Sequence, residues 1–296
     1  MLNIEIIKCP NCMEAMLHQE DRLTCCKCGS EFDVVDGLYY LYPNDMDMEH
    51  LNEEILLSKK MCVKEKNDKE LFVEKQWAQS KKEFWDMVKK NVFSNDQYIL
   101  YVGCGFDDGF KNFSDDKVFI NFDIVPDMLK SLMKKGAKYC VAGDINKMPF
   151  RNSSFDCIII VDVIHHEYER IYDIIASFTG LLKSGGKIFI EDPNAWGLNQ
   201  FYKSKILPKN IYRTLRKKYH SIKKSTHRPA DYEYPTDVWV MKHILERLGY
   251  KEINVCDNYA YPNVGKMFYG FYKMLSGISR VRKYHNFHYM INAKIY

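Results

Sequence analysis

The chain has 296 residues, of which 46% are hydrophobic and 28% are charged, and its formal net charge is +4. This length suggests one large domain with or without a small appendage, and this composition excludes a wholly disordered protein. The sequence has no run of about 18 apolar residues that would mark a membrane-spanning helix, and its first residues do not resemble a secretory signal. We therefore expect a cytoplasmic protein whose ten cysteines stay reduced.

Two Cys-x-x-Cys pairs lie close to the N-terminus, Cys9 with Cys12 and Cys25 with Cys28. Four thiolates at this spacing suit a tetrahedral Zn²⁺ ion. Such a site is structural rather than catalytic, because four sulfur ligands leave no position for water. Cys26 is a spare thiol, and the spacing alone does not exclude it as a ligand in place of a neighbour.

Together with the cysteine pairs, the strand pattern that follows them predicts a small zinc ribbon over residues 1–43. Alternating apolar and polar residues predict that one strand over residues 32–42 closes the ribbon. Residues 44–69 are polar and predict a partly helical linker. Residues 70–92 have helical spacing, which fits either a packing helix or a lid over a ligand.

From residue 97 onward, apolar runs alternate with helical patterns. This alternation predicts an α/β fold with a doubly wound parallel sheet. The run at 155–161 is almost wholly apolar, as expected for a strand covered on both faces. The expected strands span 98–102, 117–122, 137–142, 155–161 and 187–191, and the expected helices span 126–135, 168–182 and 236–248.

Glycines and polar residues follow these strands, at the edge where an open parallel sheet binds its ligands. Gly103 and Gly105 follow the first strand and allow a tight turn close to a ligand. Asp123 follows the second strand at the distance from the glycines that suits a ribose-binding carboxylate. The polar residues after the third and fourth strands are Asp144, Asp162, His165 and His166.

Residues 97–192 resemble the class I S-adenosylmethionine-dependent methyltransferases of the small-molecule type. The motifs that carry the resemblance are a glycine loop, a ribose-binding acid, a Gly-Asp…Met-Pro-Phe block, a Phe-Asp pair, a histidine pair and a Leu-Leu-Lys-Ser-Gly-Gly turn. They lie at 99–105, 122–124, 143–150, 155–156, 164–166 and 181–186. The resemblance implies a Rossmann-like sheet of seven strands, the last two at 251–256 and 288–295.

The resemblance also implies a site for S-adenosylmethionine at the strand ends. Asp123 would hold the ribose hydroxyls, Asp144 would meet the adenine amine and Asp162 would lie beside the sulfonium. Gly103 and Gly105 would pass beneath the methionine part, and Ile124 and Ile145 would enclose the adenine ring. Asp107 would complete the implied site near the cofactor amine.

Two positions depart from the family pattern. The family usually has an acid where Tyr101 stands, and often a third glycine where Asp107 stands. Because of these departures, we also keep the hypothesis of a binding module that retains the fold without catalytic turnover.

An acceptor oxygen with a high pKa needs a base to remove its proton. His166, His165 and Asp162 are the candidate catalytic residues, because they follow the fourth strand near the implied sulfonium. The histidine pair has a second interpretation, in which one ring packs against the cofactor. An amine acceptor would need no base.

The basic residues gather in two segments. Residues 203–228 hold ten Lys and Arg and no acid, and residues 258–296 hold six and no acid. The first segment lies within an insertion over residues 195–235, where apolar residues at steps of three and four predict a helix. This segregation predicts an anionic partner.

We therefore expect O-methylation of a small molecule or of a phosphate-bearing glycan or lipid-linked intermediate. An rRNA or tRNA base N-methyltransferase is the alternative, since the ribbon resembles those that precede rRNA guanine methyltransferases. Peripheral contact with a membrane stays open as well, because basic helix faces favour anionic lipid. The oligomeric state is not indicated.

Overall fold

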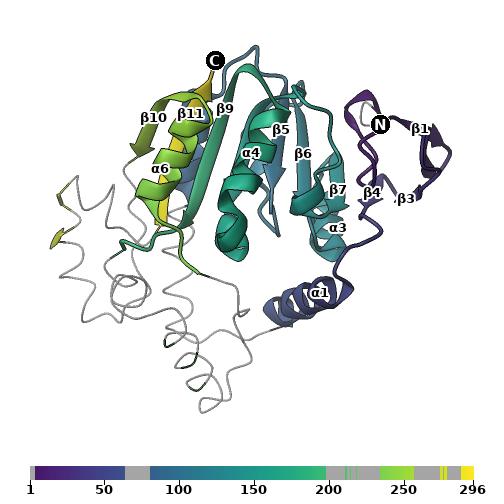
Figure 1. Cartoon of the computed structure of the whole chain (residues 1–296), viewed down its shortest axis with the longest axis horizontal. Helices are drawn as coiled ribbons and strands as arrows, with labels where there is room; N and C mark the ends of the chain where they lie inside the picture. The colour runs from purple at the N-terminus through teal and green to yellow at the C-terminus, as the bar shows by residue number, and fades with distance from the viewer. Residues whose placement is uncertain are drawn as a thin grey trace.

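The computed structural model describes residues 4–63, 81–197, 234–256 and 288–296, with a few single residues between 211 and 278. Figure 1 shows a twisted sheet that runs across the molecule from β10 at one edge to the N-terminal strands at the other. Most of the helix expected within the basic insertion, and most of the second basic segment, lie outside the described residues.

The order of the strands confirms a doubly wound α/β sheet. It runs β1-β2-β3-β4-β7-β6-β5-β8-β9-β11-β10. The chain reverses its direction of travel across the sheet after β7, so the switch point lies between β5 and β8, its neighbour on the other side. Strands β4 to β9 pair in parallel in this part, whereas β11 is antiparallel to both β9 and β10. The strands are β5 (Tyr98–Val102), β6 (Val118–Asp123), β7 (Tyr139–Gly143), β8 (Phe155–Val161), β9 (Leu182–Pro193), β10 (Tyr250–Cys256) and β11 (His288–Ile295).

The expected number of seven strands is wrong, because the sheet has 11. The N-terminal region adds four, and the last of them, β4, pairs in parallel with β7. This pairing satisfies backbone groups that an exposed β7 edge would leave without partners. The added strands are β1 (Met16–Gln19), β2 (Arg22–Cys25), β3 (Glu31–Val35) and β4 (Leu38–Leu41).

The single strand expected over residues 32–42 is a hairpin instead. Asp36 and Gly37 stand between β3 and β4 with φ angles of 52° and 83°. Positive φ at both central residues is the geometry of a tight two-residue hairpin turn, and Asp-Gly is a favoured pair for it. The turn sends β4 away from the ribbon and onto the main sheet.

Helices cover both faces of the sheet. Leu100 and Val102 of β5 pack in a cluster with α4 and α6, whereas Ile99 and Tyr101 pack in another with α3 and helix 81–91. Alternate residues of a strand point to opposite faces, so β5 is buried on both sides. Phe84 and Trp85 are buried in this second cluster, so the described part of the predicted segment, 81–91, is a packing helix, whereas residues 70–80 lie outside the described residues. The helices are α1 (Met48–Val63), α3 (Pro126–Lys134), α4 (Ile171–Leu181), α6 (Val238–Arg247) and 3₁₀ helices η1 (Ile4–Ile6), η2 (Gly109–Asn112), η3 (Ile145–Lys147) and η4 (Ile164–Arg170).

Strand β9 begins earlier than its apolar run suggested. It spans Leu182–Pro193 and so includes the Ser-Gly-Gly sequence expected to form a turn. Gly185, with a φ of 77°, accommodates the irregular start, and the pairing with β8 shifts register there. The strand also extends past residue 191, which places Glu191 and Asp192 within it.

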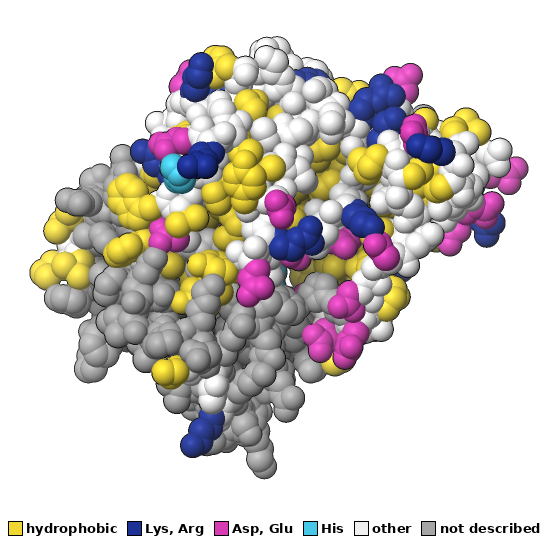
Figure 2. All heavy atoms as spheres, viewed as in Figure 1, with side chains coloured by type: hydrophobic (Ala, Val, Ile, Leu, Met, Phe, Trp, Pro, Cys, Tyr) yellow, Lys and Arg dark blue, Asp and Glu magenta, His cyan; other side chains and the backbone are white. Residues whose placement is uncertain are grey.

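The described surface is mixed in charge. On the face drawn in Figure 2, basic and acidic side chains of the described residues are interspersed. Within the described ranges, no helix has the length and apolar character needed to cross a bilayer. The polar region after the ribbon does contain a helix, α1. The division into ribbon, linker and methyltransferase domain stays a prediction.

Candidate functional site

The glycine loop after β5 is shaped by its own neighbours. Gly103 and Gly105 have φ angles of 65° and 52°. A Cβ on Gly103 would lie 1.9 Å from Cγ2 of Val163, so no larger residue fits. The close approach that requires this glycine is therefore an internal one, with the loop after β8. Gly105 has no such neighbour, and its nearest atom is Sδ of Met128 at 3.7 Å.

Asp123, at the end of β6, is a buried carboxylate held by the backbone. Its Oδ2 accepts a hydrogen bond from the amide of Gly105 at 2.7 Å, and its Oδ1 accepts one from the amide of Val125 at 2.9 Å. Burial raises the pKa of this carboxyl group, and the backbone hydrogen bonds oppose that rise. The side chain thus ties the loop after β5 to the loop after β6.

Asp144, at the end of β7, is also held by a backbone amide. Its Oδ1 accepts hydrogen bonds from the amide and side chain of Asn146, at 2.8 and 3.0 Å, and so begins η3. The Asn146 side chain also donates to Glu167 in η4 at 3.2 Å. Ile124 and Ile145 follow the two acids and are half-buried, which leaves apolar surface at the edge of the sheet.

The two departures from the family pattern lie in contact with each other. The hydroxyl of the buried Tyr101 donates to Oδ2 of Asp107 at 3.1 Å. The ammonium of Lys81, in helix 81–91, lies 3.0 Å from the same oxygen. Burial would lower the pKa of Lys81, but the Asp107 carboxylate outweighs it and the pKa is raised. A carboxylate therefore lies beside the glycine loop, supplied by Asp107 and oriented by Tyr101.

Asp162 follows β8 in a left-handed conformation with a φ of 55°. A non-glycine residue in this region is uncommon and often marks a functional position. Its amide donates to the carbonyl of Glu191 at 2.9 Å. Nδ1 of His288 lies 3.5 Å from Oδ1 of Asp162 and 3.5 Å from Oε1 of Glu191. Burial raises the pKa of Asp162, which the nearby His288 opposes.

His165 belongs to a chain of hydrogen bonds. Its Nδ1 lies 3.0 Å from Oδ1 of the fully buried Asp192. Oδ2 of Asp192 accepts a hydrogen bond from Thr236 at 2.8 Å, and the Thr236 hydroxyl is 2.8 Å from that of Tyr289. The ring of His166 lies against that of His165, with 4.2 Å between centroids. The ring of His165 is therefore oriented by a carboxylate.

The sequence reasoning missed this network except for Asp162 and His165. The signal available for Asp192 was the pair Glu191-Asp192, which interrupts an apolar strand at the ligand edge. Thr236 and His288 carried no local signal, because their partners lie 44 or more residues away in the chain. Ligand atoms of Asp162, His165 and Asp192 lie within 4.8 Å of one another, as a metal site would require. Both oxygens of Asp192 already accept hydrogen bonds, which favours the acid–histidine network.

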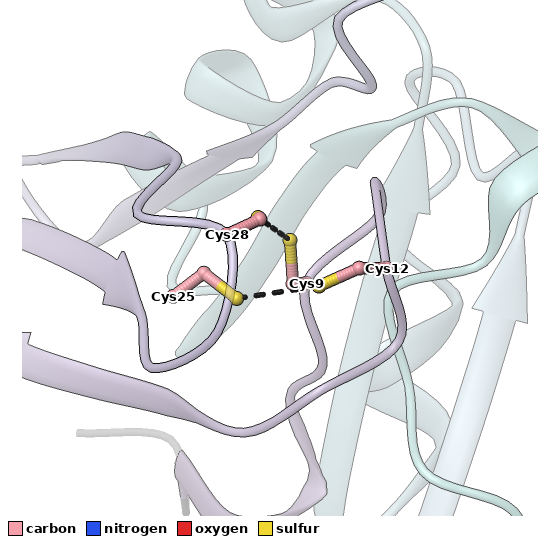
Figure 3. Close-up of side chains that lie close together, drawn as sticks. All are labelled: Cys9, Cys12, Cys25 and Cys28. Carbon is pink, nitrogen blue, oxygen red and sulfur yellow. Dashed lines mark hydrogen bonds between the residues drawn. The ribbon is translucent and has the colours of Figure 1, made fainter.

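The four cysteines that we expect to bind zinc lie close together in the N-terminal region (Figure 3). Their sulfur atoms all lie within 4.8 Å of one another, with 3.6 Å between Cys9 and Cys28 and 3.4 Å between Cys12 and Cys25. Sulfurs about 2.3 Å from a tetrahedral Zn²⁺ ion would be about 3.8 Å apart, so the arrangement suits that metal. Cys26 is exposed and stands outside the group.

Comparison with known families supports the class that the strand order and the strand-end residues suggest. Residues 100–190 match the family model described as a methyltransferase domain. This region carries the glycine loop, the three strand-end acids and the histidine pair. The sequence of these residues is therefore that of a methyltransferase domain. The resemblance seen in the sequence is confirmed to that extent.

More distant similarities extend beyond this region. A protein of Encephalitozoon cuniculi that is named as a methyltransferase is 26% identical to this chain over 128 residues. The matched residues are 42% of this chain. The match spans 58% of that curated relative, little more than half its length. A structure of a methyltransferase from Archaeoglobus fulgidus covers 71% of this chain, with 94% of its own length matched, at 18% identity and a TM-score of 0.43. A chain from a Haloferax volcanii complex of a methyltransferase with the Trm112 activator covers 83%, with 96% of its own length matched, at 10% identity and a TM-score of 0.49.

Proposed function

We propose that this protein transfers a methyl group from S-adenosylmethionine to an acceptor hydroxyl. The observation that carries the proposal is the His165–Asp192 contact of 3.0 Å, which sets an oriented imidazole beside Asp162 at the switch point of a methyltransferase sheet. Bound cofactor would supply an activated methyl group on a sulfonium, together with its leaving group.

The residues at the strand ends suit the parts of this cofactor. Its amino-acid end carries an ammonium and a carboxylate, and Asp107 and Lys81 offer the opposite charges beside the glycine loop. Asp123 offers a carboxylate already oriented by two backbone amides, as a ribose diol requires. Asp144 would accept from the adenine amine, and the half-buried Ile124 and Ile145 would enclose the ring.

His165 is the residue that we assign as the base. With Asp192 ionised, the proton of the neutral ring lies on Nδ1, where it donates to Oδ1. The lone pair is then on Nε2, which can take the proton of an acceptor hydroxyl as that oxygen is methylated. The network through Thr236 and Tyr289 holds Asp192 and therefore the orientation of the ring. His166 would pack against His165, and Asp162 would lie near the sulfonium.

The proposed acceptor is a small molecule, or a phosphate-bearing glycan or lipid-linked intermediate. The two basic segments of the sequence support an anionic acceptor, and the oriented base supports an oxygen nucleophile. Methylation of an RNA base is the second candidate. The cysteine cluster and the two basic segments of the sequence favour it. Against a module without turnover stands the Tyr101–Asp107 contact, which supplies the carboxylate that the motif otherwise lacks.

Isothermal calorimetry with S-adenosylmethionine and S-adenosylhomocysteine tests the proposal. We expect saturable binding of both, and no heat at high micromolar cofactor would contradict every enzymatic hypothesis. Binding to bulk RNA at 50 and 200 mM salt then separates the acceptor classes. An RNA enzyme should lose affinity steeply over this range, because binding to phosphates releases counterions.

We also propose that Cys9, Cys12, Cys25 and Cys28 hold a structural Zn²⁺ ion. Metal analysis of the purified protein should find one zinc per chain, and Cys12→Ser should lower this content. Cys26→Ser is the matched control, because its exposed thiol lies two residues from Cys28 but outside the cluster. Equal zinc content in both variants would refute the assignment of ligands.

A further inference from the structure

Residues 4–45 contain the four cysteines and are called the four-cysteine unit here. Strand β4 brings this unit to the edge of the sheet that carries the proposed cofactor loops. Leu41 of β4 lies opposite Gly143 of β7 in a parallel pairing. Because both strands run in the same direction, the chain leaving β4 runs beside the loop that carries Asp144. Figure 1 shows β4 between the ribbon strands and β7. Residues 42–45, which follow β4, are thus placed against the cofactor edge.

Two side chains of residues 42–45 contact the loops after β6 and β7. The hydroxyl of the half-buried Tyr42 donates to the carbonyl of Ile124, next to Asp123, at 2.8 Å. Burial and the nearby Asp123 carboxylate raise the pKa of Tyr42, which keeps the hydroxyl protonated as a donor. The carboxylate of Asp45 binds the ammonium of Lys147, the last residue of η3, at 2.6 Å. The same short segment therefore holds both loops.

The same segment is tied to the cysteine cluster. Asn11, between Cys9 and Cys12, accepts a hydrogen bond from the amide of Asn44 at 2.8 Å. The Asn11 side chain also donates to Ser30 beside the second cysteine pair, at 3.0 Å. One asparagine thus links both cysteine pairs to the segment that holds the cofactor loops.

A second connection lies just before the first cysteine. The amide of Lys8 donates to the carbonyl of Pro149 at 2.9 Å, and the amide of Arg151 donates to the carbonyl of Ile6 at 2.8 Å. Residues 149–151 follow η3, so the N-terminal unit contacts the Asp144 loop from both ends. The loop that would receive the adenine is therefore bounded by backbone pairing with the cysteine unit on each side.

We propose that the four-cysteine unit is a working part of the cofactor site, and that its Tyr42 is a positioning residue for the ribose and adenine loops. The inference rests on the proposed function, because it concerns the same strand-end site. Metal that orders the cysteine pairs would also order Asn11, residues 42–45 and the two loops. Metal occupancy and cofactor affinity are then thermodynamically linked, and the linkage is reciprocal. Cofactor should strengthen the binding of zinc by the same factor by which zinc strengthens the binding of cofactor.

Tyr42→Phe tests the positioning role by removing a single hydroxyl. We expect the Kd for S-adenosylhomocysteine, measured by calorimetry, to rise by about fivefold or more, within the range usual for coupled sites. Zinc content should stay at the wild-type level. Tyr250→Phe is the matched control, because it removes a hydroxyl on β10, at the other edge of the sheet, which accepts a hydrogen bond from Thr179 of α4. An equal Kd in wild type and Tyr42→Phe would overturn the inference.

Removal of zinc with a chelator supplies a readout that does not depend on cofactor. Amide hydrogen exchange should quicken in residues 123–127 and 144–150 of the zinc-free protein, and exchange in α4 should stay unchanged. Unchanged exchange in both loops would overturn the inference even if cofactor binds. Wild-type protein that binds no cofactor would contradict the proposed function instead, while faster exchange in the two loops would still show that the cysteine unit holds them.

Discussion

The ligand edge of the sheet has two halves that are built differently. On the side of β6 and β7, the carboxylates directly after these two strands are held by backbone amides, as Asp123 is by Gly105 and Asp144 is by Asn146. On the side of β8, β9 and β11, the carboxylates are held by other side chains, as Asp192 is by His165 and Thr236. The first half is proposed to bind the cofactor, and the second to act on the acceptor.

The difference suits the two tasks. A carboxylate fixed by backbone amides has its geometry set by the fold and presents a constant acceptor to the cofactor. A carboxylate fixed by histidine and threonine belongs to a network in which a proton can change place, as acid–base chemistry requires. The boundary between the halves is the switch point of the sheet, between β5 and β8.

The largest effect that we expect is from Asp192→Asn. An amide of the same size can donate to Nδ1 of His165, which would leave the lone pair on the wrong nitrogen. We expect kcat to fall by roughly 10²- to 10⁴-fold, the usual contribution of a general base. Cofactor affinity should change little. Stopped assays of methyl transfer and calorimetry measure the two quantities separately.

A purely structural role for Asp192 predicts a different result. Loss of packing would lower thermal stability and cofactor affinity together, and would leave the pH profile of kcat/KM unchanged. A base oriented by Asp192 predicts that the acidic limb of that profile moves in the variant. Asp173→Asn is the matched control, because Asp173 is exposed in the first turn of α4.

A smaller effect is expected at Asp123, which tests the backbone-held half. Asp123→Asn places an amide where two backbone N–H groups already point, so one acceptor for the ribose diol is lost. We expect cofactor affinity to fall about 10- to 100-fold, since hydrogen bonds to charged groups contribute roughly 1.5–3 kcal/mol each. Lys138→Gln, which removes an exposed ion pair with Asp115, should leave affinity at the wild-type level.

The pH dependence of cofactor binding sharpens this test. Burial raises the pKa of Asp123 above its usual 3.8 in the free protein. Ribose hydroxyls donate to the charged form, so binding should strengthen as the pH rises through that raised pKa. The Asn variant has no proton to lose at this position and should show a shallower profile over this window. An identical slope in both proteins would exclude Asp123 as the titrating group.

The sequence predicted the positions of Asp123 and Gly105 at the ends of their strands, because both follow short local patterns, and their roles toward a cofactor stay predictions. Asp123 follows Gly105 by 18 residues, and both lie at the ends of strands that the apolar runs marked correctly. Of the side-chain network only Asp162 and His165 were predicted, because Thr236 and His288 come from segments whose position depends on the whole sheet. The 11-stranded sheet was missed for a related reason. No local pattern states that β4 leaves its hairpin to pair with β7.

The smallest effect is expected from His288, which links Asp162 to Glu191 at the start of β11. Burial would lower the pKa of this imidazole, but the two carboxylates outweigh it, and the pKa is raised above 6.5. The raised pKa means that the folded state binds the proton more tightly than the unfolded state. The stabilisation is therefore complete below pH 6.5 and is lost as the pH rises through the folded pKa, at about 1.4 kcal/mol for each unit of difference.

Thermal unfolding of wild type and His288→Asn across pH 5–9 measures this contribution. The Tm of the wild type should decline above pH 6.5, and the variant should lack that decline. His243→Asn is the control, since that imidazole is mostly exposed on α6. Asp162, whose pKa is also raised, titrates from 3.8 upward and so affects the acidic side of the profile. If the Tm of His288→Asn still declines above pH 6.5, His288 is not the group that causes the decline. The side-chain network at β8, β9 and β11 would then rest on His165 and Asp192 alone.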